Sequence, residues 1–249
     1  RSDNDSGVRK FLKKMDSFFI KTLVSSFNFG IVLSDGLANK YLPNKPTMVI
    51  PGIVNNAFVN KYKNRGTPNI ENDFFIITYC GSLNSDYGVD KLIDAVLLLE
   101  SNVRLYCYGK GDQVNRLLLL QKTDVRFNYG GFLSEGELID AMKESDLLVN
   151  VRPANTNVSK MSFPSKLLEY ACTGKPILTT RLLSIPNRIK NYFYYIDGDS
   201  VESIAKSIIR IQGLTPKERE LKGMALREKV LINYTDKGLL SSLNKILPQ

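Results

Sequence analysis

A short polar cluster at the predicted start of a helix is the part of this sequence best suited to hold a charged ligand. It lies in the segment SFPSKLLEY, where Ser165 and Lys166 follow Pro164. Proline fixes the backbone ahead of the helix and places Ser165 at or beside the N-cap. Unpaired amides in a first helical turn, a hydroxyl and a lysine are groups that bind a diphosphate. We therefore predict a diphosphate site at this helix start.

Glu169 lies one helical turn beyond Ser165, on the same face of the predicted helix. Beside a bound phosphate, its carboxylate can accept hydrogen bonds from sugar hydroxyls. The alternative is an ordinary surface ion pair with Lys166 or Lys175. The residues alone leave both interpretations open. Only the first predicts that Glu169→Ala weakens nucleotide binding, by about 1 to 3 kcal/mol.

Three further loops, each directly after a predicted strand, contain glycine. Ligands of open parallel sheets bind at the carboxyl ends of the strands, and glycine lets the backbone approach a phosphate or a base closely. The alternative is that a strand-to-helix turn simply needs glycine. Neither a Walker A sequence nor the third glycine of GxGxxG is present. The loops are Cys80-Gly81-Ser82, Gly109-Lys110-Gly111-Asp112 and Gly130-Gly131-Phe132.

Histidine is absent from the 249 residues, which excludes a Ser-His triad and histidine-based zinc sites. Any catalysis then depends on carboxylates, backbone amides and cations. The sequence Asp197-Gly198-Asp199 spells the D-x-D of metal-dependent transferases. Because it follows a late strand, it is predicted to be a solvated turn.

The cysteines and the hydropathy pattern indicate a globular protein in a reducing compartment. Cys80, Cys107 and Cys172 lie in apolar stretches without metal-ligand spacing, which predicts core residues. No run of about 18 uncharged apolar residues occurs, so no membrane-spanning helix is predicted. We expect a cytoplasmic protein. Arg1 is neither an initiator methionine nor part of a signal peptide, as expected for a cut inside a longer chain.

The formal net charge of +9 calls for a partner, and residues 8–27 carry part of it in a basic amphipathic helix. One interpretation is that the apolar face of this helix packs on its own domain. The other is that it contacts an anionic membrane surface, which would place the protein peripherally on the inner face of the plasma membrane. No pattern typical of nucleic-acid binding occurs.

Short apolar runs alternate with helical patterns from residue 74 onward, which is typical of βαβ units. The sequence therefore predicts an α/β fold, a Rossmann-like parallel sheet flanked by helices. The predicted strands are residues 74–79, 103–108, 125–129, 147–151, 176–180 and 193–196. The predicted helices are residues 89–100, 113–121, 135–143, 166–172, 204–211, 216–234 and 238–246, with a capping box of Ser134 and Glu137.

Residues 29–34 and 48–52 are predicted to be strands of a second, partial α/β unit, followed by a polar link over residues 60–73. This unit is too small to form an independent sheet. We predict an N-terminal remnant and linker over residues 1–70, a ligand-binding domain over residues 71–235 and a C-terminal helix over residues 236–249.

These segments resemble, in order and spacing, the donor-binding C-terminal domain of the retaining GT-B glycosyltransferases of family four. The matching segments are IITYCGSL, GVDKLIDA, YGKGD, FNYGGFLS, SDLLVNVRP and FPSKLLEYACTGKPIL. FGIVLSDGLANKYL and TMVIPGIVNNAF resemble the end of the family's N-terminal domain. The resemblance covers roughly residues 74–211, with these earlier segments in addition.

The resemblance assigns roles to individual residues. Glu169 matches the second glutamate of the family's E-x7-E motif, which grips the ribose of the donor nucleotide, while the first glutamate falls on Met161. The family's diphosphate cations fall on Ser82 and Tyr87, so Arg152 and Lys166 are the nearest substitutes. The implied donor-binding set is Gly81, Ser82, Gly109, Gly111, Gly131, Phe132, Arg152, Met161, Phe163, Pro164, Ser165, Lys166 and Glu169.

The implied activity is transfer of a hexose from a UDP- or GDP-sugar to a glycan or lipid-linked acceptor in bacterial surface polysaccharide synthesis. The acceptor would be bound by an N-terminal domain of which this chain carries only the end. The fragment is therefore expected to bind donor and transfer nothing. The resemblance implies retention, no metal and no cofactor, and names no catalytic residue. A GT-B nucleotide-sugar epimerase and a non-catalytic binding or assembly module stay open as alternatives.

Overall fold

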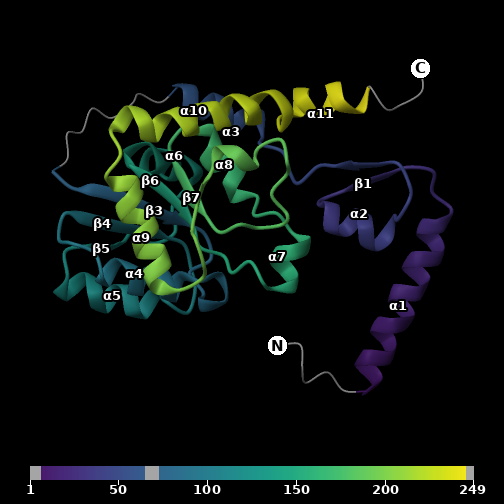
Figure 1. Cartoon of the computed structure of the whole chain (residues 1–249), viewed down its shortest axis with the longest axis horizontal. Coiled ribbons are helices and arrows are strands. Elements are labelled where there is room, and N and C mark those ends of the chain that lie inside the picture. Colours follow the sequence, from purple (N-terminus) through teal and green to yellow (C-terminus); the bar gives the residue numbers. More distant parts are fainter. Residues whose placement is uncertain (1–6, 65–72, 245–249) are drawn as a thin grey trace.

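The computed structural model describes residues 7–64 and 73–244 of the chain (Figure 1). It contains a six-stranded parallel sheet of order β5-β4-β3-β6-β7-β8, which confirms the predicted α/β fold. The central strand β3 is buried at all six positions. The strands are β3 (Phe75–Cys80), β4 (Val103–Tyr108), β5 (Phe127–Tyr129), β6 (Leu147–Asn150), β7 (Ile177–Thr179) and β8 (Tyr194–Tyr195).

Helices cover both faces of this sheet because each parallel crossover returns along one face. One apolar core lies under α4 (Val89–Leu97), α5 (Val114–Thr123) and α9 (Val201–Gln212). The other core lies under α3 (Asn56–Asn64), α6 (Glu135–Glu144), α8 (Lys166–Cys172) and α10 (Pro216–Asn233). In β3, Ile77 belongs to the first core and Cys80 to the second, as the two-residue period of a strand requires.

Local signals fix where several helices begin. The predicted capping box of Ser134 and Glu137 is present at α6. A second box of Thr215 and Glu218, with Pro216 at the first turn, starts α10. Two short 3-10 turns, η1 (Ser85–Tyr87) and η2 (Lys190–Tyr192), complete the larger domain.

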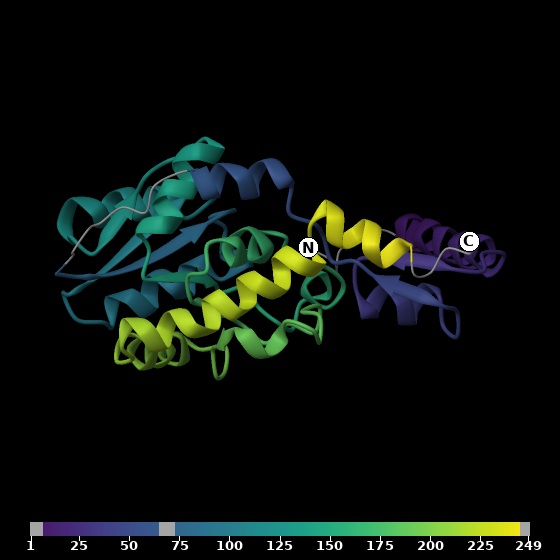
Figure 2. The ribbon, with the colours of Figure 1, turned by 90° about the horizontal axis from the view of Figure 1, so that it is seen from above.

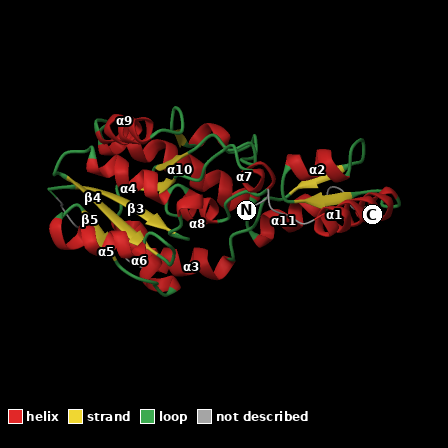
Figure 3. Ribbon diagram, turned by 90° about the horizontal axis from the view of Figure 1, so that it is seen from below, coloured by secondary structure: helices red, strands yellow, loops and turns green. Residues whose placement is uncertain are grey.

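A smaller unit precedes this domain along the chain. It contains α1 (Gly7–Ser25), α2 (Asp35–Tyr41) and a parallel pair of strands, β1 (Gly30–Val32) and β2 (Thr47–Val49). Figure 2 shows α10 leading into α11 (Asp236–Leu243), which returns from the larger domain toward this unit. In Figure 3 the two sheets lie at opposite ends of the ribbon.

The apolar face of α1 is exposed among the described residues, and both interpretations of residues 8–27 stay predictions. Phe11, Phe18 and Leu23 are 63%, 67% and 64% exposed, and none joins either apolar core of the described residues. Figure 1 shows α1 on the outer side of the small unit, away from the six-stranded sheet. No helix among the described residues is long and apolar enough to cross a membrane.

Two segments of the chain pass between the smaller unit and the larger domain, one before α3 and one between α10 and α11. They pair with each other. The Val54 amide donates to the Tyr234 carbonyl at 2.7 Å, and Val54 forms a parallel bridge with Thr235. The Asn56 side-chain amide donates to the Asp236 carboxylate at 2.9 Å. We call this pairing of Val54 with Tyr234 and Thr235 the junction.

Two helices of the structure, α3 and α7 (Asn157–Met161), were not predicted from the sequence. Residues 60–64, predicted to be part of a polar link, are the last turn of α3, whose Phe58 and Val59 are buried. The polar stretch after Pro153 contains α7, which begins at an N-cap on Thr156. The predicted domain boundary at residue 70 lies outside the described residues.

Candidate functional site

The loops after β3, β4, β5 and β6 meet at one edge of the sheet and line two adjoining cavities. Cys80 pairs with Tyr108 at the ends of β3 and β4, so the loops that follow begin side by side. The glycine-loop cavity, of about 310 Å³, is lined by Cys80, Gly81, Ser82, Tyr108, Gly109, Lys110, Phe132, Leu133, Leu138 and Lys166. The Arg152 cavity, of about 340 Å³, shares Cys80, Gly81, Ser82 and Lys166 and adds Arg152 with residues 162–165.

Arg152 is the unusual cation of this site, because it is only 8% exposed. Its guanidinium has no hydrogen bond or ion pair to any residue in ranges 7–64 and 73–244, and lies 5.5 Å from the Tyr87 ring centre. The Thr180 hydroxyl donates to the Arg152 carbonyl at 2.6 Å and fixes the backbone. A buried cation is costly without a counter-charge, so a guanidinium that lines an open cavity is well placed to bind an anion.

Lys166 lines both cavities and also forms an ion pair with Glu169, at 2.7 Å. Both side chains are about one-third exposed, at 33% and 32%. The ion pair that was the alternative interpretation of Glu169 is therefore formed, and the ribose contact stays a prediction. Ser165 stands at the N-cap as predicted but makes no capping bond, which leaves its hydroxyl available to the Arg152 cavity.

Tyr170 ties α8 to the end of β3. Its hydroxyl accepts from the Cys80 amide at 2.7 Å and donates to the Cys80 carbonyl at 3.1 Å, and the ring is 1% exposed. The Tyr79 hydroxyl donates to the Ser82 carbonyl at 2.9 Å from the other side. The loop of Gly81 and Ser82 is thus held from both faces of the sheet. The sequence reasoning missed this role of Tyr170, although a tyrosine in a buried helix needs a hydroxyl partner.

The glycines of the β4 loop are needed for packing between loops. A side chain on Gly109, whose φ is +138°, would place its Cβ 1.8 Å from the Gly81 carbonyl oxygen. The Gly81 amide donates to Tyr108 and the Gly109 amide to Gly131, at 2.9 and 2.7 Å. Because these two amides are already hydrogen-bonded within the protein, Gly81 and Gly109 are explained by the turns they form. A ligand would then be held mainly by the side chains that line the cavities.

Phe132 and Lys110 form the outer wall of the glycine-loop cavity. The Lys110 ammonium lies 5.1 Å from the Phe132 ring centre, and Phe132 is 74% exposed. An exposed aromatic ring beside a cavity offers a stacking surface for a planar group. Lys110 was not among the predicted site residues, although a lysine between two glycines at a strand end was a visible signal.

The structure does not bring every predicted site residue to the cavities. Gly111, Gly131, Met161 and Glu169 are absent from both linings. The Met161 carbonyl accepts from the Ser34 hydroxyl at 2.8 Å, so α7 contacts the start of α2 in the smaller unit. Met161 is therefore a contact between the two parts of the molecule. Its predicted place in the donor site stays a prediction.

The remaining polar motif is a turn, as predicted. Asp197 is exposed and pairs with Arg181 at 3.4 Å and Arg210 at 3.1 Å, and Gly198 has a φ of +118°. The part of the chain that the structure describes contains no group of three or more His, Cys, Asp or Glu that could hold a metal.

The three cysteines are core residues, as predicted. They are at most 4% exposed. Burial raises the pKa of the Cys80 and Cys172 thiols to about 12, so both are inert thiols at neutral pH.

The parallel sheet, the loops at its carboxyl edge and the smaller unit joined by two crossing segments define the chain as part of a GT-B glycosyltransferase. Residues 60–225 match the family described as "Glycosyl transferases group 1", and the chain belongs to this family. No curated protein matches the chain in sequence.

Solved structures share the fold at low identity. Sucrose-phosphate synthase from Thermosynechococcus elongatus matches 94% of the chain at 15% identity and a TM-score of 0.70. HepE from Anabaena, solved with UDP and glucose, matches 95% at 13% identity and 0.61. WaaG, a glycosyltransferase involved in lipopolysaccharide biosynthesis, matches 86% at 20% identity and 0.58. The chain spans 61%, 69% and 60% of these three proteins.

Proposed function

We propose that the chain holds the nucleotide-sugar donor of a hexosyltransferase, with the diphosphate in the Arg152 cavity. The observation that carries this proposal is Arg152 itself, a residue only 8% exposed that lines a cavity and has no carboxylate partner in the described ranges. Lys166 and the Ser165 hydroxyl line the same cavity. A diphosphate supplies the missing negative charge and accepts hydrogen bonds from all three groups.

The nucleoside would occupy the neighbouring glycine-loop cavity. The exposed ring of Phe132 offers a stacking surface to the base, and Lys110 lies beside it. Glu169 would grip the ribose, exchanging its Lys166 partner for sugar hydroxyls. UDP is the nucleotide in the HepE structure and supports a UDP-sugar over a GDP-sugar as donor.

In this proposal Arg152 and Lys166 stabilise the diphosphate as the bond between the sugar and its phosphate oxygen breaks. Charge that develops on the leaving oxygen is then met by cations already in place, so no cation has to move. The transfer would be retaining and independent of metal. The acceptor would be a glycan or lipid-linked sugar of a bacterial capsule or lipopolysaccharide, bound largely outside the described residues. The lipopolysaccharide role named for WaaG supports this class of acceptor.

We also propose that α1 contacts an anionic membrane surface, where a lipid-linked acceptor would be found. Its exposed apolar face, with Phe11, Phe18 and Leu23, is the observation that favours this contact. Lys13 lies on the side of the helix away from Phe11 and Phe18, and Lys14 lies beside these two rings, so both would be near anionic lipid headgroups. The protein would then act at the cytoplasmic side of the membrane.

Titration calorimetry of the whole chain with UDP, GDP and their hexose derivatives tests the donor proposal. We expect a nucleotide diphosphate to bind, and Arg152→Ala to weaken it about 10- to 100-fold, the value of a charged hydrogen-bonded contact. Arg116→Ala is the matched control, because this arginine pairs with Asp94 on the surface and removes the same charge. Equal affinities for the two variants would contradict the role of Arg152.

A further inference from the structure

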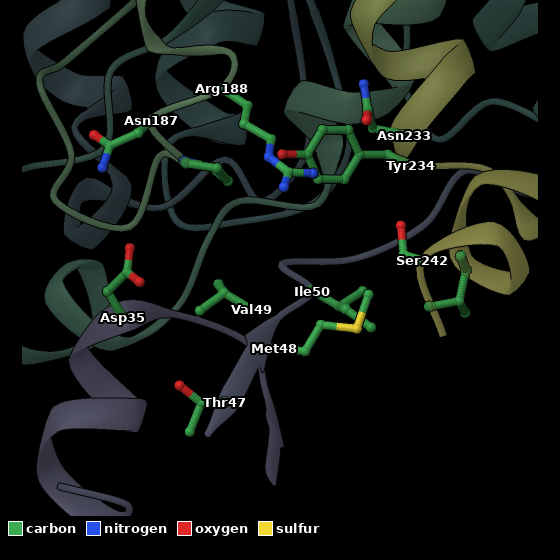
Figure 4. Close-up of a pocket in the computed structure, with 12 residues that line it drawn as sticks. Asp35, Thr47, Met48, Val49, Ile50, Asn187, Arg188, Asn233, Tyr234 and Ser242 are labelled. Atoms are coloured by element: carbon green, nitrogen blue, oxygen red, sulfur yellow. The ribbon is translucent and has the colours of Figure 1, made fainter. Parts of the chain in front are cut away.

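A third cavity lies beside the junction, between the smaller unit and the six-stranded domain. Its volume is about 460 Å³, and none of its lining residues lines the glycine-loop or Arg152 cavity. Its walls come from the start of α2, from β2, from the loop after β7, and from α10 and α11 (Figure 4). We call it the junction cavity. A ligand inside it would contact both parts of the molecule at once.

One wall of the junction cavity carries hydrogen-bond donors and a positive charge. Tyr234 is 6% exposed, yet its hydroxyl makes no hydrogen bond to a described residue. Burial raises the pKa of Tyr234 and the nearby Arg188 guanidinium opposes this, so at neutral pH the hydroxyl keeps its proton. Arg188 has no ion pair or hydrogen bond within the described ranges, and Figure 4 shows it beside Tyr234. This wall is suited to a carboxylate or phosphate.

The facing wall is suited to hydroxyl groups. Figure 4 shows the Asp35 carboxylate across the open space from Arg188, and Asp35 has no ion pair in the described part of the chain. It lies in the first turn of α2, and its carboxylate oxygens can accept hydrogen bonds. Met48, Val49 and Ile50 supply apolar surface between these walls, against which the C–H face of a sugar ring can pack.

We propose that the junction cavity binds a sugar that carries an anionic group, either a phosphate or a carboxylate. A free anion would use Arg188 and Tyr234 but would be repelled by Asp35, and a neutral sugar would make no use of the charge on Arg188. An anionic hexose satisfies both walls, with its charged group at Arg188 and its hydroxyls at Asp35. This proposal goes beyond donor binding and does not depend on it.

Calorimetric titration of the whole chain with glucose 6-phosphate, glucuronate, glucose and inorganic phosphate tests the proposal. We expect one of the two anionic sugars to bind at least ten times more tightly than glucose or phosphate, and the tighter one identifies the charged group. Arg188→Ala should weaken it at least ten-fold and Tyr234→Phe several-fold. Lys190→Ala removes the same charge from an exposed residue at the start of η2, two positions beyond Arg188 and outside this cavity, and should leave the affinity unchanged.

Three results would overturn the proposal: no binding of either anionic sugar, binding of phosphate as tight as that of glucose 6-phosphate, or unchanged affinity in Arg188→Ala. The thermal melting of each variant reports whether it folds. If Arg188→Ala does not fold, Tyr234→Phe, which keeps the buried ring, tests the cavity in its place. UDP titrations of the same variants separate the two sites. UDP affinity is expected to be unchanged in Arg188→Ala, and a chain that fails to bind UDP can still bind the anionic sugar.

Discussion

The six-stranded domain and the small N-terminal unit contain the same kinds of elements but bury them very differently. Leu105 of β4 is fully buried between the sheet and its helices, whereas Leu23 of α1 is 64% exposed. The larger domain has helices on both faces of its sheet and so completes its own core. The smaller unit has only two strands, fewer than a sheet needs for independent stability. The larger domain thus closes a core of its own, whereas the apolar face of α1 in the smaller unit stays exposed.

The largest expected difference between the larger domain and the smaller unit is in how much a leucine-to-alanine substitution lowers stability. Leu105→Ala creates a cavity in a closed core and is expected to lower the free energy of unfolding by about 2 to 5 kcal/mol. Leu23→Ala removes the same atoms from an exposed site and is expected to change it by less than about 0.5 kcal/mol. Urea unfolding followed by circular dichroism measures both, because the chain contains no tryptophan. Similar losses in the two variants would show that α1 is buried after all.

The same contrast explains how much of the fold could be predicted from the sequence. Strands β3 and β4 were predicted to within a residue. In β3 a continuous apolar run marks a strand buried on both faces, and in β4 buried residues alternate with half-buried ones. Helix α3 was missed because its many lysines and asparagines make the segment look polar. Phe58, Val59 and Tyr62 nevertheless have helical spacing. Helix α7 has five residues, too few for a periodic pattern to show.

The loops of the candidate site could be predicted from the sequence. The burial of its side chains and the contacts between distant residues could not. Glycine and the FPSK segment marked the sheet edge because these residues constrain the local backbone. The burial of Arg152 depends on three loops closing over it, and the bonds from Tyr170 to Cys80 join distant parts of the chain. The junction cavity joins Asp35 to Arg188, which no local pattern connects. Such features follow from tertiary packing and need the structure.

The next largest effect concerns the rigidity of the site in the stable region. Tyr170→Phe leaves the buried Cys80 amide without its partner, so we expect a stability loss of about 1 to 3 kcal/mol. Because the Gly81 loop follows Cys80 directly, UDP affinity should also fall several-fold. Tyr62→Phe is the control, since it removes a hydroxyl that donates to the Thr173 carbonyl at 2.7 Å, away from both cavities. Unchanged UDP affinity in Tyr170→Phe would make Tyr170 a structural residue only.

A substitution at Glu169 tests whether its carboxylate leaves Lys166 and binds the ribose when the nucleotide binds. Glu169→Gln keeps the shape but loses the ion pair with Lys166, and UDP affinity should fall by about 1 to 2 kcal/mol if the carboxylate grips the ribose. The same variant should lose little affinity for 2′,3′-dideoxy-UDP, which lacks the ribose hydroxyls. Calorimetry with both ligands completes the comparison. An equal loss for the two nucleotides would favour the ion pair as the only role of Glu169.

The smallest effect concerns the exposed region. If α1 lies on a membrane surface, Leu23→Ala should weaken binding to vesicles containing anionic lipid about two- to five-fold, since one leucine leaves the interface only in part. Leu119→Ala is a close match, because Leu119 on α5 is 66% exposed, against 64% for Leu23.

Co-sedimentation with vesicles of phosphatidylcholine, with and without phosphatidylglycerol, measures the two variants against the unmodified chain. Binding should require the anionic lipid and should weaken as salt screens the lysines of α1. If Leu23→Ala and Leu119→Ala bind equally well, the exposed face of α1 has another partner. The contrast between the closed domain and the open unit would then describe a protein interface in place of a membrane contact.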